Sequence, residues 1–245
     1  MKFFLIAGEA SGDLHASNLM KALRVKDPQA MFVGLGGDKM REEGCDIRVD
    51  YREMAYMGFV AVLQNLDKVK RNFRIAKQSL LEQKPNVLIL IDYPSFNLKI
   101  AKFCKKHLPN TRIIYYIPPK IWAWKTWRIH NIAKYCDNIL GIFPFEPDFY
   151  AKYGYKCHYV GNPTVDCIRE FTSTTHTIHH TNTIAILPGS RRSEISHCLP
   201  TMLEAARAVA KNKYQIIVAA APGIDDSFYQ TYLENEALTR NPYAT

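Results

Sequence analysis

Apolar runs alternate with amphipathic segments along most of this 245-residue chain. Short apolar runs bounded by glycine, proline or polar residues predict strands, and apolar residues at three- and four-residue intervals predict helices. The expected strands are residues 3–7, 31–35, 86–91, 112–117, 138–142, 158–160, 183–187 and 215–220. The expected helices include residues 66–83, 98–107, 126–135 and 146–153, together with one from Ser193 onward. Such alternation predicts an α/β architecture with a mainly parallel sheet, whose ligands lie at the carboxyl ends of the strands.

A glycine-rich turn follows the first expected strand. Gly8 and Gly12 allow the backbone to approach a ligand without Cβ collisions, and Ser11 or Asp13 can cap the helix that begins there. The spacing differs from the G-x-G-x-x-G of a dinucleotide site, so the turn argues against NAD.

A second turn, Pro188-Gly189-Ser190-Arg191, joins an apolar run to a helix whose periodicity is clear. The helix pattern consists of Ile195, Leu199, Met202, Leu203, Ala206 and Val209. First-turn N–H groups and a helix dipole favour an anion, and Arg191 can add a charge-assisted contact. The turn therefore predicts a phosphate site, although an ordinary strand-to-helix turn with a solvated arginine fits the same residues.

Two further turns carry candidate chemistry. Asp92 comes directly after an apolar strand, where it can act as a general base, bind a sugar hydroxyl or cap the next helix, a task for which Asn97 is better placed. All three tryptophans, Trp122, Trp124 and Trp127, stand within six residues among basic residues. They can stack on bases or sugars, lie at a membrane interface, or begin a buried helix.

Composition indicates a globular protein with a partner of negative charge. The chain is 47% hydrophobic and 22% charged, with a formal net charge of +9. Its six cysteines contain no Cys-x-x-Cys pair, which argues against a zinc site or a disulfide framework and favours a reducing cytoplasm. Residues 169–182 are rich in Thr and His and predict a linker between a domain of residues 1–168 and one of residues 183–245. The histidines of that linker are expected to be solvated rather than to bind a metal.

Taken together, these stretches resemble one family, lipid-A-disaccharide synthase, a nucleotide-sugar glycosyltransferase. The matching segments occur in the family's order over nearly the whole chain. They are Ala7-Gly8-Glu9-Ala10-Ser11-Gly12-Asp13, Phe32-Val33-Gly34-Leu35-Gly36-Gly37, Glu43-Gly44-Cys45, Met57-Gly58-Phe59-Val60-Ala61-Val62-Leu63, Ile91-Asp92-Tyr93-Pro94-Ser95-Phe96-Asn97, Trp122-Ala123-Trp124, Pro144-Phe145-Glu146, Val160-Gly161-Asn162-Pro163 and Leu187-Pro188-Gly189-Ser190-Arg191.

The resemblance implies a GT-B fold of two Rossmann-like halves and an inverting reaction. UDP-2,3-diacylglucosamine and 2,3-diacylglucosamine 1-phosphate would form a β-1,6 disaccharide and release UDP, with no cofactor, metal or nucleic acid. It implies Asp92 and Glu9 as catalytic residues. The implied substrate-binding residues are Ser11, Gly12, Asp13, Asn97, Gly189, Ser190 and Arg191, and the implied acyl-chain or membrane residues are Phe59, Val60, Val62, Leu63, Leu66, Trp122 and Trp124. Peripheral association with the inner leaflet of the cytoplasmic membrane and a possible homodimer follow from the same resemblance.

The resemblance also implies a longer chain. Family members complete the second Rossmann-like half with a uracil and ribose site, so we expect the domain of residues 183–245 to be incomplete, with two strands and little core. Two alternatives stay open beside the transferase: a lipid- or nucleotide-sugar-binding remnant without activity, and a nucleic-acid-binding protein suggested by the charge and the tryptophans.

Overall fold

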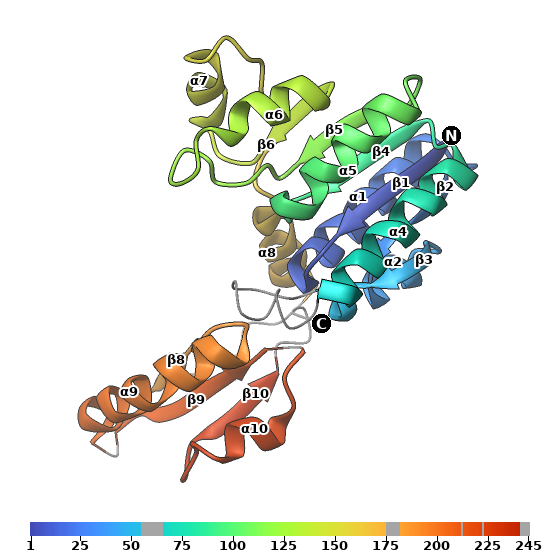
Figure 1. Cartoon of the computed structure of the whole chain (residues 1–245). Helices are drawn as coiled ribbons and strands as arrows, with labels where there is room; N and C mark the ends of the chain where they lie inside the picture. Colours follow the sequence, from blue (N-terminus) through green and yellow to red (C-terminus); the bar gives the residue numbers. More distant parts are fainter. Residues whose placement is uncertain (55–65, 175–181, 212, 222, 241–245) are drawn as a thin grey trace. The chain divides into compact units, whose positions relative to one another are not determined.

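The structure, a computed structural model, describes residues 1–54, 66–174, 182–211, 213–221 and 223–240. It divides into two compact units, Met1–Val165 and Asp166–Thr245, here called unit 1 and unit 2. Each unit is described by itself (Figure 1).

Unit 1 is built on a parallel sheet. Among its described residues seven strands pair in the order β3-β2-β1-β4-β5-β6-β7. The strands are β1 (Lys2–Ala7), β2 (Met31–Gly36), β3 (Asp46–Asp50), β4 (Val87–Ile91), β5 (Arg112–Tyr116), β6 (Asn138–Gly141) and β7 (His158–Tyr159). The chain moves outward from β1 to β3 and then returns to place β4 on the other side of β1. The strand order therefore reverses between β1 and β4.

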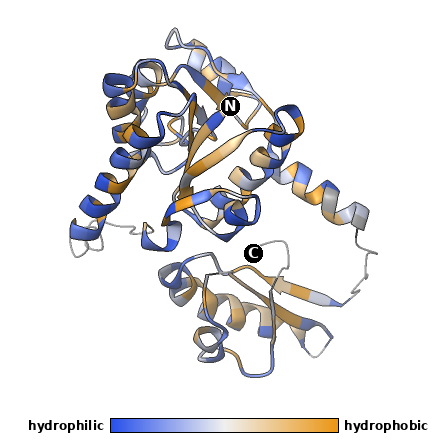
Figure 2. Ribbon diagram, turned by 90° about the vertical axis from the view of Figure 1, so that its right-hand side faces the viewer, coloured by the Kyte–Doolittle hydropathy of each residue, from blue (hydrophilic) through white to orange (hydrophobic). Residues whose placement is uncertain are grey.

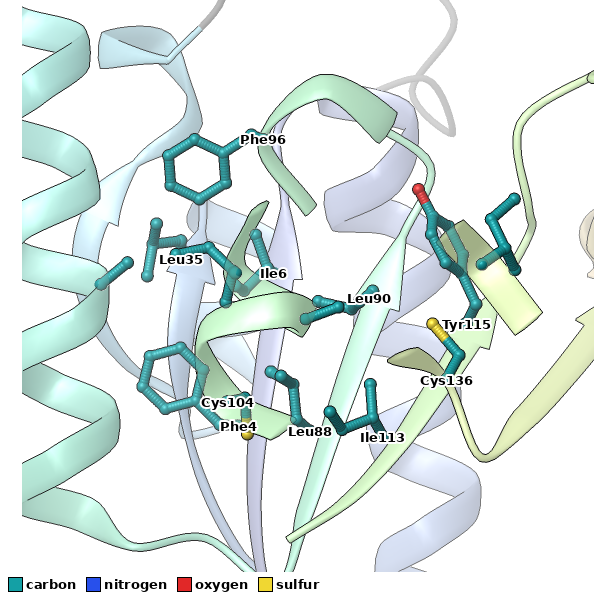
Figure 3. Close-up of a cluster of buried hydrophobic side chains, with 14 of the residues drawn as sticks. Phe4, Ile6, Leu35, Leu88, Leu90, Phe96, Cys104, Ile113, Tyr115 and Cys136 are labelled. Carbon is teal, nitrogen blue, oxygen red and sulfur yellow. The ribbon is translucent and has the colours of Figure 1, made fainter. Parts of the chain in front are cut away.

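Helices cover both faces of this sheet (Figure 1). Successive strand residues point to opposite faces, so Phe3 and Leu5 pack with α1 (Ala10–Lys26) and α2 (Asp38–Glu42), whereas Phe4 and Ile6 point to the other side. That second face is covered by α4 (Leu66–Gln83), α5 (Pro94–His107) and α6 (Arg128–Tyr135) and forms the cluster in Figure 3. Strand β4 is buried along its whole length, as expected for a strand with both faces covered.

Three further elements complete the described chain up to residue 174. They are the 3-10 turn η1 (Tyr51–Glu53), α7 (Glu146–Ala151) and α8 (Pro163–Thr174). Helix α8 includes the first residues of the segment expected to be a linker, and residues 175–181, with its three histidines, lie outside the described residues.

Unit 2 has a parallel sheet of three described strands in the order β10-β9-β8. They are β8 (Thr183–Ile186), β9 (Gln215–Ala220) and β10 (Ala237–Arg240), and the helices are α9 (Arg192–Ala210) and α10 (Asp226–Gln230). Ile195, Leu199 and Leu203 of α9 pack with Val218 and with the fully buried Tyr229. Figure 2 shows the strands of each unit as predominantly hydrophobic, with hydrophilic residues on the outer helix surfaces.

The predicted α/β class with parallel, Rossmann-like sheets is confirmed, and each of the eight expected strands is present to within a residue or two. Among the described elements, the strands β3 and β10 and the helices α2 and α8 were not expected. The expectation of two strands and little core for residues 183–245 is wrong, because β10 adds a third strand and the unit has a hydrophobic cluster of its own. Met202 and Val209, which fitted the helix periodicity, lie on the exposed side of α9.

Candidate functional site

The reversal of strand order between β1 and β4 places the candidate site. In open α/β sheets of this strand order, ligands bind outside the carboxyl ends of the strands at the point of reversal. Glu9 follows β1 and Asp92 follows β4, and these two strands are direct neighbours with Ala7 opposite Ile91. The two residues predicted to be catalytic therefore follow the two strands that flank this point.

Asp92 begins an unusual turn. Asp92 and Tyr93 have φ values of 41° and 43°, in the left-handed region that residues with a Cβ rarely adopt. The Asp92 N–H donates to the Ile117 carbonyl at 3.2 Å. The Asp92 carbonyl accepts the Tyr115 hydroxyl at 2.7 Å and the Asn97 Nδ2 at 2.8 Å. These bonds fix the backbone, and the residue itself is exposed at the sheet edge.

Asn97 has a different place from the one expected. It is fully buried in the first turns of α5, and its Nδ2 donates to the carbonyls of both Ile91 and Asp92. Its Nδ2 thus binds backbone groups at the end of β4, and its buried Oδ1 has no hydrogen-bond partner among the described residues. Neither Asp92 nor Asn97 caps the helix, since α5 begins at Pro94 with Tyr93 at the N-cap position.

The turn after β1 is locked to the turn after β4. A Cβ built on Gly8 would lie 2.4 Å from Cγ of the Tyr93 ring, so glycine is required there. The Tyr93 hydroxyl donates to the Met54 carbonyl at 2.6 Å, which fixes the ring from its far end. Gly12 is buried, with its hypothetical Cβ at 3.2 Å from Cβ of Ala7.

Asp13 holds the loop after β2. Its carboxylate is 3% exposed and accepts the backbone N–H groups of Gly37, Lys39 and Met40 at 2.7, 3.0 and 3.2 Å. Burial raises the pKa of this carboxyl, and the three N–H groups oppose that rise. Asp13 thus satisfies donors at the start of α2 and does not cap α1, whose N-cap residue is Glu9. We expected Asp13 to bind substrate, and the structure turns its carboxylate inward.

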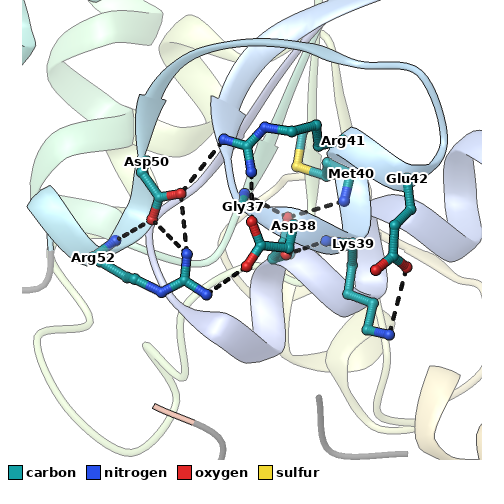
Figure 4. A network of polar contacts seen from close by, with 9 residues as sticks. Gly37, Asp38, Lys39, Met40, Arg41, Glu42, Asp50 and Arg52 are labelled. Carbon is teal, nitrogen blue, oxygen red and sulfur yellow. Dashed lines mark hydrogen bonds and ion pairs between the residues drawn. The ribbon is translucent and has the colours of Figure 1, made fainter.

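The loop that Asp13 holds is further tied by ion pairs (Figure 4). Arg52 contacts both Asp38 and Asp50, and Arg41 reaches the same two carboxylates. These surface pairs each contribute little stability, but together they connect α2, β3 and η1. Of the predicted residues on the β1 turn, Glu9 is half-buried and Ser11 is exposed, whereas Gly12 and Asp13 are buried.

Sequence reasoning missed Arg128 as a residue of this region. Its Nη2 lies 3.2 Å from the Ser95 Oγ in the first turn of α5, and its guanidinium lies 5.7 Å from the centre of the Trp127 ring. Arg128 makes no ion pair with the described residues, so it brings a positive charge to the turn that carries Asp92. Its place directly after the tryptophans was a usable signal, but only the contact with Ser95 connects it to Asp92.

The tryptophan segment is exposed. Trp124 is 72% exposed, and Lys125 Nζ lies over its ring, 4.1 Å from the ring centre. Trp122 is 37% exposed and meets Phe143 and Phe145 edge-on. The alternative of a buried helix start is wrong, because Trp127 at the N-cap position of α6 is exposed and the buried apolar residue of the segment is Ile121.

Of the residues predicted to contact acyl chains, Leu66 begins α4 and is exposed. Phe59, Val60, Val62 and Leu63 lie outside the described residues. No described helix has the length and apolar character needed to cross a membrane.

The predicted anion turn of unit 2 is engaged by a carboxylate of its own helix. Gly189 has φ +123°, and Arg191 is the N-cap residue of α9. Glu194 Oε2 accepts the Ser190 N–H at 3.1 Å, and Glu194 Oε1 pairs with the Arg191 guanidinium. Arg191 holds the pKa of Glu194 below its usual value. An anion would meet the predicted donors here, in competition with Glu194.

The part of the chain that the structure describes holds no cluster of three or more His, Cys, Asp or Glu side chains able to bind a metal. The described sites offer the Asp92 carboxylate in unit 1, on a turn whose Ser95 contacts Arg128, and backbone N–H groups with Arg191 in unit 2.

Rossmann-like units with these sites define the class, a GT-B-like α/β protein. The chain resembles the solved S. aureus MnaA-UDP co-structure with a TM-score of 0.72 at 11% identity, covering 99% of this chain and 69% of that one. It also resembles UDP-GlcNAc 2-epimerase from Neisseria meningitidis bound to UDP-GlcNAc, with a TM-score of 0.64 at 10% identity, covering 99% and 73%. At these identities the likeness concerns the fold.

The chain belongs to the lipid-A-disaccharide synthetase family, whose model matches residues 3–240. It is 39% identical to the lipid-A-disaccharide synthase of Trichlorobacter lovleyi over 95% of this chain and 62% of that protein. It is 36% identical to that of Myxococcus xanthus over 97% of this chain and 64% of that protein. The chain thus spans about three fifths of the length of these curated relatives. The family expected from the sequence is confirmed.

Proposed function

We propose that the protein acts as an inverting glycosyltransferase of lipid A assembly. It joins UDP-2,3-diacylglucosamine to 2,3-diacylglucosamine 1-phosphate, forms a β-1,6 disaccharide and releases UDP. Family membership supports this assignment. The observation that carries it is Asp92: an exposed carboxylate after β4, at the reversal of strand order, on a backbone fixed from three sides.

In this proposal Asp92 is the general base. It takes the proton from the 6-hydroxyl of the acceptor, whose oxygen attacks the anomeric carbon of the donor while the bond to the diphosphate breaks. Inversion follows because attack comes from the face opposite the leaving group. Glu9, half-buried in the turn after the neighbouring strand β1, assists Asp92. Exposed Ser11 receives the acceptor beside Gly12, which is buried against Ala7.

Arg191 is proposed to bind the diphosphate of the donor. A guanidinium stabilises the negative charge that develops on the leaving group, and the Gly189-Ser190 backbone supplies N–H groups beside it. The geometry of the turn supports this role, because the same donors already hold the Glu194 carboxylate.

Peripheral attachment to the inner leaflet of the cytoplasmic membrane is part of the proposal. Exposed Trp122 and Trp124 suit the headgroup region, and Lys125 beside Trp124 suits anionic lipid. Leu66 and the segment with Phe59, Val60, Val62 and Leu63 are proposed to meet acyl chains. A homodimer is proposed on the family resemblance alone, and light scattering would test it.

The test is a transfer assay with radiolabelled UDP-diacylglucosamine, acceptor and either the wild-type chain or Asp92→Asn. Loss of a general base costs roughly 10²- to 10⁴-fold in turnover, while donor affinity stays similar. Near-normal turnover of Asp92→Asn would remove Asp92 from the mechanism. Substrate binding by the wild type without any product would favour the binding-only alternative, and retention of RNA in a filter-binding test beside it would favour the nucleic-acid alternative.

A further inference from the structure

The backbone at Asp92 is held in a conformation that it would not adopt unaided. Two successive residues with φ near +40° each bring a Cβ close to a carbonyl oxygen, which is costly for every residue except glycine. Aspartate tolerates this region better than most residues, but tyrosine at position 93 does not share that advantage. Surrounding contacts must therefore stabilise the turn.

Tyr115 provides one of those contacts from the neighbouring strand. It lies on β5, two positions from Ile113, and is fully buried in the cluster of Figure 3. There its hydroxyl points along the direction in which β4 and β5 run. The hydroxyl donates to the Asp92 carbonyl at 2.7 Å, which is a short and direct bond.

Burial keeps Tyr115 in the form that can donate. Because the phenol is fully buried and the Asp92 carboxylate lies nearby, the pKa of Tyr115 is raised well above its usual value. The raised pKa favours the protonated hydroxyl, which is the form that donates a hydrogen bond. The second donor, Asn97 Nδ2 at 2.8 Å, comes from α5. The Asp92 carbonyl oxygen thus accepts one hydrogen bond from β5 and one from α5.

Tyr150 shows that burial alone does not impose such a bond. It is also a fully buried tyrosine of unit 1, yet its hydroxyl has no hydrogen-bond partner among the described residues. The two tyrosines are alike in burial and differ in what their hydroxyls reach. Tyr150 is therefore a matched control for removal of the Tyr115 hydroxyl.

We propose that Tyr115 is a positioning residue. Its hydroxyl, together with the Asn97 amide, clamps the Asp92 carbonyl by two hydrogen bonds and so fixes the orientation of the Asp92 side chain at the carboxyl edge of the sheet. Tyr115 touches no substrate in this assignment and acts through Asp92. The catalytic consequence rests on the proposed role of Asp92 as base. The positioning itself does not.

The deciding experiment is NMR of the 245-residue protein, labelled with ¹³C and ¹⁵N, in four versions: wild type, Tyr115→Phe, Tyr115→Phe/Asn97→Leu and Tyr150→Phe. In Tyr115→Phe the Asp92 carbonyl ¹³C resonance should move upfield and the Asp92 and Tyr93 amide signals should shift. The double variant should extend those changes, and Tyr150→Phe should leave them at their wild-type positions. This readout needs no turnover. Unchanged Asp92 signals in Tyr115→Phe would overturn the proposal, as would equal changes in Tyr150→Phe.

Steady-state transfer kinetics then separate this proposal from the proposed function. Loss of one clamping bond should lower kcat about tenfold with KM nearly unchanged, because the base is misaligned while binding surfaces persist. Tyr150→Phe should match the wild type. If Asp92→Asn keeps near-normal turnover while the NMR changes in Tyr115→Phe are present, the base assignment fails and the clamp stands. If the Asp92 signals stay fixed while Asp92→Asn is inactive, the clamp fails and the base assignment stands.

Discussion

The ring of Tyr93 covers Gly8, leaving only 2.4 Å between its Cγ and the place where a Cβ on Gly8 would be. Gly8 directly follows β1, and Tyr93 belongs to the turn after β4. This contact therefore joins the two turns at the reversal of strand order. The ring cannot simply rotate away, because its hydroxyl is bonded to the Met54 carbonyl. The glycine is thus explained by packing against Tyr93, whereas the sequence had suggested close approach to a ligand.

Gly8→Ala should destabilise unit 1 by about 1–3 kcal/mol, the usual cost of forcing an extra methyl into a tightly packed position. Urea unfolding followed by tryptophan fluorescence measures it, since all three tryptophans are in unit 1. Ser11→Ala, an exposed change on the same turn of unit 1, is the control and should leave the unfolding midpoint unchanged. Equal stability of Gly8→Ala and wild type would mean that the Tyr93 ring moves freely.

The left-handed backbone conformation of Asp92 should affect the free energy of unfolding, which can be measured without an activity assay. Asparagine tolerates this region as aspartate does, so Asp92→Asn should unfold within about 0.5 kcal/mol of the wild type. Asp92→Ala should lose roughly 1 kcal/mol more, because alanine has no local hydrogen bond to compensate the strain. The same urea experiment compares the two variants. A more stable alanine variant would argue that position 92 is unstrained in solution.

Most of the sheet could be predicted from the sequence because its central strands are apolar along their whole length. The run Val87–Ile91 is buried on both faces and has no polar interruption. Strand β3 contains no apolar run, because Asp46, Arg48 and Asp50 alternate with its apolar residues. Such alternation is typical of an edge strand with one solvent-exposed face. Strand β10, with the sequence Ala-Leu-Thr-Arg, holds a single large apolar residue, so no apolar run marks it.

The candidate site was predictable only in part. The rule that ligands lie at strand ends selected Asp92, and the family resemblance added Glu9; the strands that precede them, β4 and β1, are neighbours. The resemblance also implied Asp13 and Asn97, whose side chains bind backbone groups. Sequence spacing does not show whether a polar side chain at a strand end faces solvent or a neighbouring loop. That choice depends on where the loops after β2 and β4 run in three dimensions.

Asp13→Ala should destabilise unit 1 through the loop after β2. Three backbone N–H groups, those of Gly37, Lys39 and Met40, lose their acceptor, and the first and last are buried with it. One unsatisfied buried donor costs about 1–3 kcal/mol. Because the bond of Lys39 is only partly buried and water can replace the lost acceptor there, we expect a loss of unfolding free energy in that range for the three donors together. Amide hydrogen exchange of Gly37 and Met40 should accelerate in the variant. Ser11→Ala, an exposed neighbour, serves as control and should change neither quantity.

The Arg191 assignment is tested by calorimetric titration of UDP. Removal of a charge-assisted contact should cost roughly 1.5–3 kcal/mol of affinity in Arg191→Ala. Glu194→Gln should bind UDP at least as well as the wild type, because it withdraws the negative charge that now occupies the same donors. Equal affinities of wild type and Arg191→Ala would place the diphosphate elsewhere, and a large loss in Glu194→Gln would show that Glu194 supports Arg191 instead of competing with the ligand.

Unit 2 should lose stability in acid through Glu236. The Glu236 carboxylate accepts the Arg207 Nε–H at 2.6 Å, and this bond lowers the pKa of Glu236 from its usual 4.5 to about 2. A depressed folded-state pKa means that the unfolded chain takes up the proton first. The stabilisation is therefore complete above about pH 4.5 and is lost as the pH falls toward 2. Because Arg207 is 35% exposed, solvent screening reduces the contribution to about 1 kcal/mol.

Glu236→Gln should flatten this part of the dependence of stability on pH. Hydrogen exchange of the β9 amides between pH 6 and 3, corrected for the intrinsic exchange rate at each pH, follows the stability of unit 2 separately from unit 1. Glu204→Gln removes the same charge from an exposed position on α9 and makes no ion pair with the described residues, so it should follow the wild type. If Glu236→Gln keeps the full wild-type acid dependence, other carboxylates govern it and the Arg207 pair contributes nothing measurable in solution.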